Sequence, residues 1–291
     1  PFIWREARSR DTLDSNMQLL LPKIIQGGMG VGVWHWRLAQ TVSRLGQLGV
    51  VSGTALDLVV ARRLQNGDPE GHIRRALVHF AFPRMAQRVL DAFFVPGGKK
   101  PDAPYKATAQ PQVHGKRTFD ELCIVSNFVE VFLAREGHGG PVGINYLEKI
   151  QLPHLPSLYG AMLAGVAVVI VGAGIAIEMP TVLDALAEHR AASYPAHVQG
   201  ATGAAAMRSV FDPAVYREEA PDGPPLARPA FFPIVSSDAL ASIFVRKAKG
   251  RIDGFIVETP VAGGHNAPPR GASRLTPDGQ PVYGPRDVAD L

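Results

Sequence analysis

The sequence predicts an α/β fold built on a parallel sheet, and two features of the chain carry this prediction. Short apolar runs recur along it, too continuous to be antiparallel strands with one exposed face. Helical segments lie between these runs, and such a strand and helix alternation demands a parallel sheet. The residues alone leave open both a doubly wound sheet and a barrel that is incomplete within 291 residues.

The strands are expected where apolar runs are bounded by turn residues, at 23–26, 48–52, 142–146, 166–171, 232–236 and 254–258. Helices are expected at 36–45, 119–135, 155–163, 181–189 and 238–249. The last of these follows Ser236 and Ser237, which are favoured N-cap residues. Residues 286–291 have the character of a helix opening, so we expect further chain beyond Leu291.

Two excursions interrupt the alternation. Residues 57–117 hold two or three amphipathic helical segments followed by a basic loop, which predicts a helical insertion. Residues 191–230 are rich in Ala and Pro and are expected to be irregular, with His197-Val198-Gln199 as a candidate short strand. Neither has the character of an independent unit, so one domain is expected over 1–291.

Composition excludes several classes of protein. Hydrophobic residues make up 46% and charged residues 19%, which excludes a disordered chain, a collagen and a coiled coil. The single cysteine, Cys123, excludes a disulfide framework and a zinc site of paired thiolates. It suits a reducing compartment, so a cytoplasmic location is expected. Residues 1–10 have no apolar segment of a secretory signal, and Pro1 indicates a start that was processed or lies upstream.

Charge and hydropathy argue against nucleic acid and membrane partners. The net charge is +4, and the one basic stretch, 99–117, is expected to be a solvated loop. Residues 158–177 carry no charge over 20 positions, yet they change halfway from small helical residues to a β-branched run. We therefore expect a helix that feeds a buried strand there, not a membrane span.

Two glycine clusters follow predicted strands. Gly27-Gly28-Met29-Gly30-Val31-Gly32 comes directly after the first strand, and four glycines in six residues exceed what a turn needs. Ligand contact is the favoured interpretation. The cluster at 172–177 resembles a dinucleotide fingerprint, but Ile177 occupies the third small position and no acid follows at the ribose distance. A dinucleotide site is therefore not expected.

A histidine follows the sixth predicted strand. In Glu258-Thr259-Pro260-Val261-Ala262-Gly263-Gly264-His265-Asn266, two glycines precede His265 at the expected mouth of a parallel sheet. An imidazole there suits a general base with a pKa near neutrality. Taken alone, a loop histidine without a role is an equal interpretation. The sequence has no HExxH or other clear metal-ligand spacing and no GxSxG nucleophile motif.

These segments together resemble a known family. PKIIQGGMGVGV, LGVVSG, GINYLEK, PIVSS and DGFIVETPVAGGHN occur in this order between residues 22 and 266. They are similar to nitronate monooxygenase, formerly called 2-nitropropane dioxygenase, and the resemblance spans about residues 22–285. It implies a (β/α)8 TIM barrel that binds FMN over the carboxyl ends of its strands. The family's last two βα units, with the FMN phosphate site, would then follow Leu291, and the 57–117 helices exceed the family pattern.

The resemblance also implies roles for individual residues, by position. Its implied flavin contacts are Gly28, Met29 and Gly30 at the ring border, Asn145 and Ser236 at strand ends, Glu258 near the cofactor, and Gly263 and Gly264 passing close to it. His265 would be the catalytic base.

Three functions from different classes stay open. The leading expectation is an FMN oxidoreductase that converts a nitronate and O₂ into a carbonyl compound and nitrite. A flavin-dependent enoyl-thioester reductase shares the AGGH element, and its basic loop at 99–117 would meet a carrier protein. A truncated barrel that binds a partner without catalysis is the third. A homo-oligomer stays open under each of them.

Overall fold

A computed structural model describes residues 22–197, 207–220, 222–259, 262, 269, 274–285 and 287. The first half of the chain contains α1 (Trp36–Arg44), β1 (Gly49–Ser52), α2 (Leu56–Gln65), α3 (His72–Leu77), α4 (Pro83–Phe93), α5 (Arg117–Arg135), β2 (Val142–Leu147) and α6 (His154–Leu163). The second half contains β3 (Val168–Gly172), α7 (Met179–Ala187), β4 (Ala192–Pro195), β5 (Arg208–Phe211), the 3-10 helix η1 (Pro213–Tyr216), β6 (Ala230–Val235), α8 (Asp238–Lys247) and β7 (Ile256–Val257).

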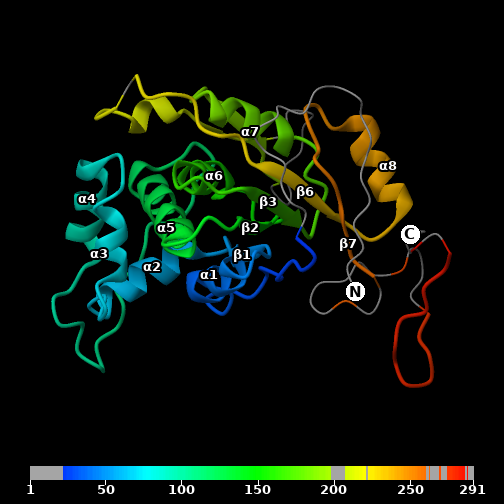
Figure 1. The fold of residues 1–291 in the computed structure, drawn as a ribbon, viewed down its shortest axis with the longest axis horizontal. Coiled ribbons are helices and arrows are strands. Elements are labelled where there is room, and N and C mark those ends of the chain that lie inside the picture. The colour runs from blue at the N-terminus through cyan, green and yellow to red at the C-terminus, as the bar shows by residue number, and fades with distance from the viewer. Residues whose placement is uncertain are drawn as a thin grey trace.

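The centre of the fold is a curled parallel sheet of five strands in the order β1-β2-β3-β6-β7 (Figure 1). All four pairings are parallel, and Ile25 adds one further parallel bridge, to Leu48 beside β1. The predicted parallel α/β architecture is therefore present as a partial barrel. It forms because each apolar run is long enough to cross the core and the helices between runs return the chain to the same sheet end.

The sheet is buried on both faces. One face, here called the inner face, carries a small cluster of alternate strand residues, including Leu48, Val50, Val168, Ile170 and Phe232. The opposite side chains, such as Val51, Ile144, Val169 and Phe231, join the large core shared with the helices. Side chains along a strand alternate between the two faces of a sheet. A strand-end residue that lies an even number of positions from an inner-face residue therefore belongs to the inner face as well.

Helix α5 is the central support of the helical layer. Of its 19 residues, 15 are buried, and it contacts α1, α2, α3, α4, α6, β1 and β2. It approaches α6 so closely that a Cβ on Gly160 would lie 2.1 Å from the carbonyl oxygen of Ile124. Only glycine permits that distance between the two helices.

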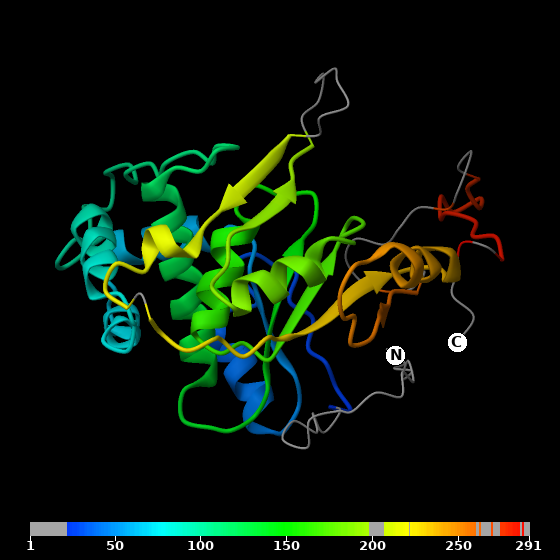
Figure 2. The same cartoon turned by 90° about the horizontal axis from the view of Figure 1, so that it is seen from above.

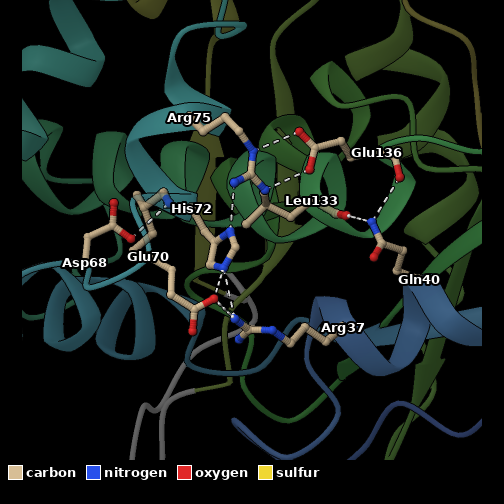
Figure 3. Close-up of polar contacts among 9 residues, drawn as sticks. Arg37, Gln40, Asp68, Glu70, His72, Arg75, Leu133 and Glu136 are labelled. Atoms are coloured by element: carbon tan, nitrogen blue, oxygen red, sulfur yellow. Dashed lines mark hydrogen bonds and ion pairs between the residues drawn. The ribbon is translucent and has the colours of Figure 1, made fainter.

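Helices α2, α3 and α4 fill the predicted excursion and pack against α5. Their outer attachment is polar (Figure 3). Arg75 of α3 donates two hydrogen bonds, of 2.9 and 2.8 Å, to the carboxylate of Glu136 after α5. Nδ1 of His72 contacts the guanidinium of Arg75, and its Nε2 contacts both Glu70 and Arg37. Because Arg37 belongs to α1, these contacts also join α3 to α1.

The chain after α7 differs from the expectation of an irregular stretch. β4 and β5 form an antiparallel hairpin outside the main sheet, which projects from the body in Figure 2. His197 lies outside β4, because its backbone N–H donates to the side chain of Gln151, 2.7 Å away, instead of to a strand. Val198 and Gln199 lie outside the described residues. Ala and Pro conceal the alternation that Ala192 and Tyr194, both buried, supply to β4.

The uncharged stretch at 158–177 divides as expected between α6 and β3. Among the helices of the described chain, none has the length and apolar character needed to cross a membrane.

Candidate functional site

The carboxyl ends of the parallel strands lie at one edge of the sheet, here called the carboxyl edge. Ser52 ends β1, Asn145 is near the end of β2, Gly172 ends β3, and Ser236 and Glu258 directly follow β6 and β7. Ser52 lies two residues after Val50 of the inner face, and Asn145 is its register partner, so both belong to the inner face. Ser236 and Glu258 belong to it as well, because they lie two residues after Ile234 and Ile256. Open α/β sheets and barrels bind their ligands at this edge.

Ser52 and Asn145 form the most informative pair at this edge. They are partners in the β1–β2 register and are 1% and 4% exposed. Ser52 Oγ and Asn145 Oδ1 are both buried without a hydrogen-bond partner among the described residues. A buried polar atom left unsatisfied costs about 1–3 kcal/mol. Two such atoms side by side are typical of a place where a ligand completes the hydrogen bonding.

The glycine loop packs on the sheet beside this pair. A Cβ on Gly28 would lie 2.5 Å from Val50 Cγ1 and 3.0 Å from Asn145 Cβ, so the loop backbone touches the sheet. Gln26 holds the loop there, because its side-chain amide accepts from Val50 N and donates to Val50 O, both at 3.0 Å. The glycine at position 28 is thus explained by close packing against β1.

The remaining loop residues have more room. Gly27 is exposed, and a Cβ added to it would meet nothing within 4 Å, whereas Met29 and Gly30 are half-buried. The carbonyl oxygen of Gly30 accepts from Val33 N and Trp34 N, which turns the chain toward α1. The loop therefore has one face packed on the sheet and one face available to a ligand.

A buried carboxylate fixes the exit of the loop. Glu130 of α5 is fully buried and accepts from Trp36 N at the start of α1, 2.8 Å away. Its second oxygen accepts from Arg63 Nη1 at 2.9 Å. His35 caps α1 by accepting from Arg37 N at 3.1 Å, and burial lowers the pKa of this imidazole. The carbonyl oxygen of Trp34 accepts from Ser52 N at 2.9 Å, so hydrogen bonds join the loop, the start of α1 and the end of β1.

Ser236 and Glu258 form a second group on the same edge, separated from the first by β3. The paired residues Val235 and Val257 precede them in register, and Glu258 N donates to Val235 O at 2.8 Å. Partial burial raises the pKa of the Glu258 carboxyl. Partial burial disfavours the charged form of this carboxyl, and among the described residues no compensating partner counteracts the shift.

The structure thus brings Gly28 and Asn145 together and places Ser236 beside Glu258. Gly263, Gly264 and His265 lie outside the described residues. In the part of the chain that is described, no group of three or more His, Cys, Asp or Glu side chains is arranged to hold a metal ion.

Sequence reasoning missed Ser52. The signal was present, because Ser52 ends an apolar run at the same inner-face parity as Asn145 and Ser236. It also missed the support behind the edge, where Tyr146 OH donates to Asn127 Oδ1 at 2.9 Å. The ring of Tyr146 explains Gly53 as well, since a Cβ there would lie 2.3 Å from Tyr146 Cε1.

Comparison of the sequence with protein-family models and with curated proteins gave no match. The chemistry of the carboxyl edge therefore rests on its own residues. They offer acceptors and donors at Ser52, Asn145 and Ser236, one carboxyl with a raised pKa, and a glycine loop beside them.

Proposed function

We propose that this chain is part of an FMN-dependent oxidoreductase of nitronate monooxygenase type, built on a TIM barrel. Its substrates would be alkyl nitronates or nitroalkanes and O₂, and its products a carbonyl compound and nitrite. The observation that supports this function is the pair of unsatisfied oxygens on Ser52 and Asn145 beneath the glycine loop. They lie at the edge where the sequence resemblance expects the flavin.

The described residues fit the ring of a flavin. Its edge carries an N–H donor and several acceptors, and Asn145 Oδ1 and Ser52 Oγ are the oxygens that lack a donor. Gly28, Met29 and Gly30 would border the ring, with Ser236 and Glu258 at its other side. When bound, the flavin takes electrons from the nitronate and passes them to O₂.

The chain's own side chains would bind substrate and move its proton. His265 and the adjoining Gly263 and Gly264 are assigned from the sequence, with His265 accepting the proton from the carbon beside the nitro group of a neutral nitroalkane. Glu258, whose pKa burial raises, would lie beside the ring and the departing nitrite. The walls of Leu48, Val50 and Ile170 keep water from the inner face.

Cofactor content and two assays test the proposal. Purified protein is expected to absorb near 450 nm, to release FMN on acid treatment, and to consume O₂ with propane-2-nitronate. NADPH oxidation with crotonyl-CoA, without nitronate-dependent O₂ uptake, would instead identify an enoyl-thioester reductase. Protein that neither retains added FMN nor turns over either substrate would contradict an enzymatic role and leave the binding function.

A further inference from the structure

A cavity lies away from the carboxyl edge. It has a volume of about 500 Å³, is open to solvent on one side, and is lined by residues of α7, the β4–β5 hairpin and the end of α8. In Figure 1 these two helices follow one another along the upper side of the molecule. Its apolar wall is formed by Ile177, Val182 and Ala185. This volume is that of an ordinary small-molecule site, and the site does not depend on the proposed flavin function.

The polar wall of the cavity is basic. It carries Arg190, Arg208, Lys247 and Lys249 against a single carboxylate, Glu178. Arg208 donates two hydrogen bonds, of 3.3 and 2.5 Å, to the carboxylate of Glu178 and so neutralises it. The lining therefore has three positive charges in excess.

The acidic residues nearby do not cancel this excess. Glu188 pairs with Arg190 at 2.6 Å, and Asp184 pairs with Arg228 at 2.8 Å. Within the described chain, neither Lys247 nor Lys249 has a carboxylate partner. Arg190, Arg208 and Arg228 are thus each neutralised by a carboxylate. The ammonium groups of Lys247 and Lys249 keep their charge without a counter-ion in that part of the chain.

The end of α8 is anchored at the cavity. Thr181 Oγ1 lies 3.1 Å from the carbonyl oxygen of Glu178 and 3.3 Å from that of Lys249, and its single hydroxyl hydrogen is shared between the two acceptors. Gly250 follows with φ +103°, and a Cβ there would lie 3.0 Å from Asp184 Oδ2 and from Pro180 Cβ. The backbone at 249–250 is thus held against α7. Across the cavity, Ser193 Oγ accepts from Arg208 Nε at 3.1 Å, which leaves the Ser193 hydroxyl hydrogen for a ligand.

We propose that this cavity binds a phosphorylated small molecule, a phosphate monoester with a partly apolar organic body. A phosphate monoester carries about −1.5 to −2 charges at pH 7, which matches the two uncompensated ammonium groups. Lysine binds phosphate as a point charge, and Arg208 and Ser193 supply directional donors. The apolar part of the lining, with Ile177 only half-buried, accounts for the organic body, because inorganic phosphate alone would leave this part of the cavity uncovered.

Calorimetric titration with adenosine 5′-monophosphate tests the proposal, with adenosine and inorganic phosphate as the two partial probes. We expect saturable binding of the nucleotide that weakens as salt rises, and at least tenfold weaker binding of either partial probe. The double variant Lys247→Ala, Lys249→Ala is expected to lose at least tenfold in affinity. Both side chains are exposed and unpaired, so its thermal midpoint without ligand stays that of the parent protein.

Matched controls separate this site from general charge and from the flavin site. Lys23→Ala with Lys100→Ala removes the same charge from two exposed positions elsewhere and is expected to bind the nucleotide normally. Ser52→Ala at the carboxyl edge is also expected to bind it normally. Glu178→Gln removes the one acidic group of the lining and is expected to tighten binding several-fold. Equal affinity in the two lysine double variants, or equal affinity for the nucleotide and adenosine, would overturn the proposal.

Discussion

Ser52 and Asn145 are register partners on β1 and β2, and each buries a side-chain oxygen that has no hydrogen-bond partner among the described residues. Folding gains nothing from either atom, since an apolar side chain of the same shape would cost less to bury. Both atoms lie on the inner face at the carboxyl edge, beneath the glycine loop. This combination makes them the sharpest test of a ligand at that edge.

Ser52→Ala is expected to keep or raise the free energy of unfolding, by about 1 kcal/mol at most, because it removes an unsatisfied hydroxyl. Under the proposed function it should also weaken FMN binding about threefold to tenfold, the effect of one lost hydrogen bond. Urea unfolding gives the first quantity, and fluorescence titration of flavin gives the second.

Ser126→Ala is the matched control for this variant. Ser126 on α5 also buries an unpartnered hydroxyl, but it belongs to a helix outside the sheet. It should show the same small stability change and an unaltered flavin affinity. Identical flavin affinity in both variants would remove Ser52 from the cofactor site.

The glycine loop offers a pair of adjacent substitutions with opposite expectations. Gly28→Ala should destabilise by about 1–3 kcal/mol, because its Cβ would lie 2.5 Å from Val50 Cγ1 and 3.1 Å from Val51 O. Gly27→Ala meets open space and should stay within about 0.5 kcal/mol of the parent. Urea midpoints with a constant m-value measure both. A tolerated Gly28→Ala would show that the loop does not touch the strand in solution.

Glu130→Gln tests the anchor of α1. The amide keeps one oxygen for Trp36 N–H but loses the charge that faces Arg63, and a hydrogen bond to a charged group contributes about 1.5–3 kcal/mol. Because Arg63 is 31% exposed and can turn to water, we expect a loss of about 1–2 kcal/mol. Glu70→Gln, in an exposed pair with Arg37, should change stability by less than about 0.5 kcal/mol. Comparable losses in both would contradict a special role for the buried carboxylate.

His154 gives the fold a defined acid sensitivity. Its Nε2–H donates to Leu147 O at 3.0 Å, its Nδ1 is buried without a partner, and burial lowers the pKa to about 4. The unfolded imidazole takes up its proton near pH 6.5, so stability is full above that value and falls as the pH drops toward 4. The loss over this window is on the order of 3 kcal/mol.

Urea unfolding between pH 4 and pH 7 measures this slope. His154→Gln keeps a donor for Leu147 O and should flatten it, whereas His114→Gln, at an exposed loop position, should leave it unchanged. A slope that persists in His154→Gln would assign the acid sensitivity to other groups.

His265→Asn tests the catalytic base assigned from the sequence. A positioned general base contributes ~10²–10⁴-fold, so turnover of a neutral nitroalkane should fall by about that factor. A preformed nitronate needs no deprotonation and should lose much less. Both rates are to be measured on flavin-replete protein from pH 5 to pH 9. Equal losses on the two substrates would make His265 a positioning residue.

The parallel sheet could be predicted because its strands are continuous apolar runs, and β2 and β3 begin and end within two residues of the expected bounds. The β4–β5 hairpin could not, since Ala and Pro conceal its alternation. The Glu130 anchor escaped prediction for a different reason. Glu130 contacts Trp36, which lies 94 positions earlier in the chain, and Arg63, which lies 67 positions earlier. A local sequence pattern cannot predict contacts over such separations.

Among the candidate site residues, Asn145, Ser236 and Glu258 share a rule that the sequence alone contains: a polar side chain at the end of an apolar run. Ser52 obeys the same rule and could have been found by it. The packing of Gly28 on β1 could not be found this way, because it depends on a contact with the side chain of Val50, which only the folded structure brings close.

The burial of α5 on almost every side decides how the excursion from α2 to α4 can be altered. Phe80 packs on Phe128 of α5, Arg88 neutralises its Glu121, and Arg63 neutralises its Glu130. A shortened chain that lacks the excursion would uncover the ring of Phe128 and leave the buried Glu130 without its counter-ion, whereas Glu121 would keep Arg117 of α5. A smaller domain without α2, α3 and α4 therefore cannot be obtained from this protein by deletion alone. It would need a redesigned outer face on α5, with the uncovered apolar positions made polar and Glu130 replaced by a neutral residue.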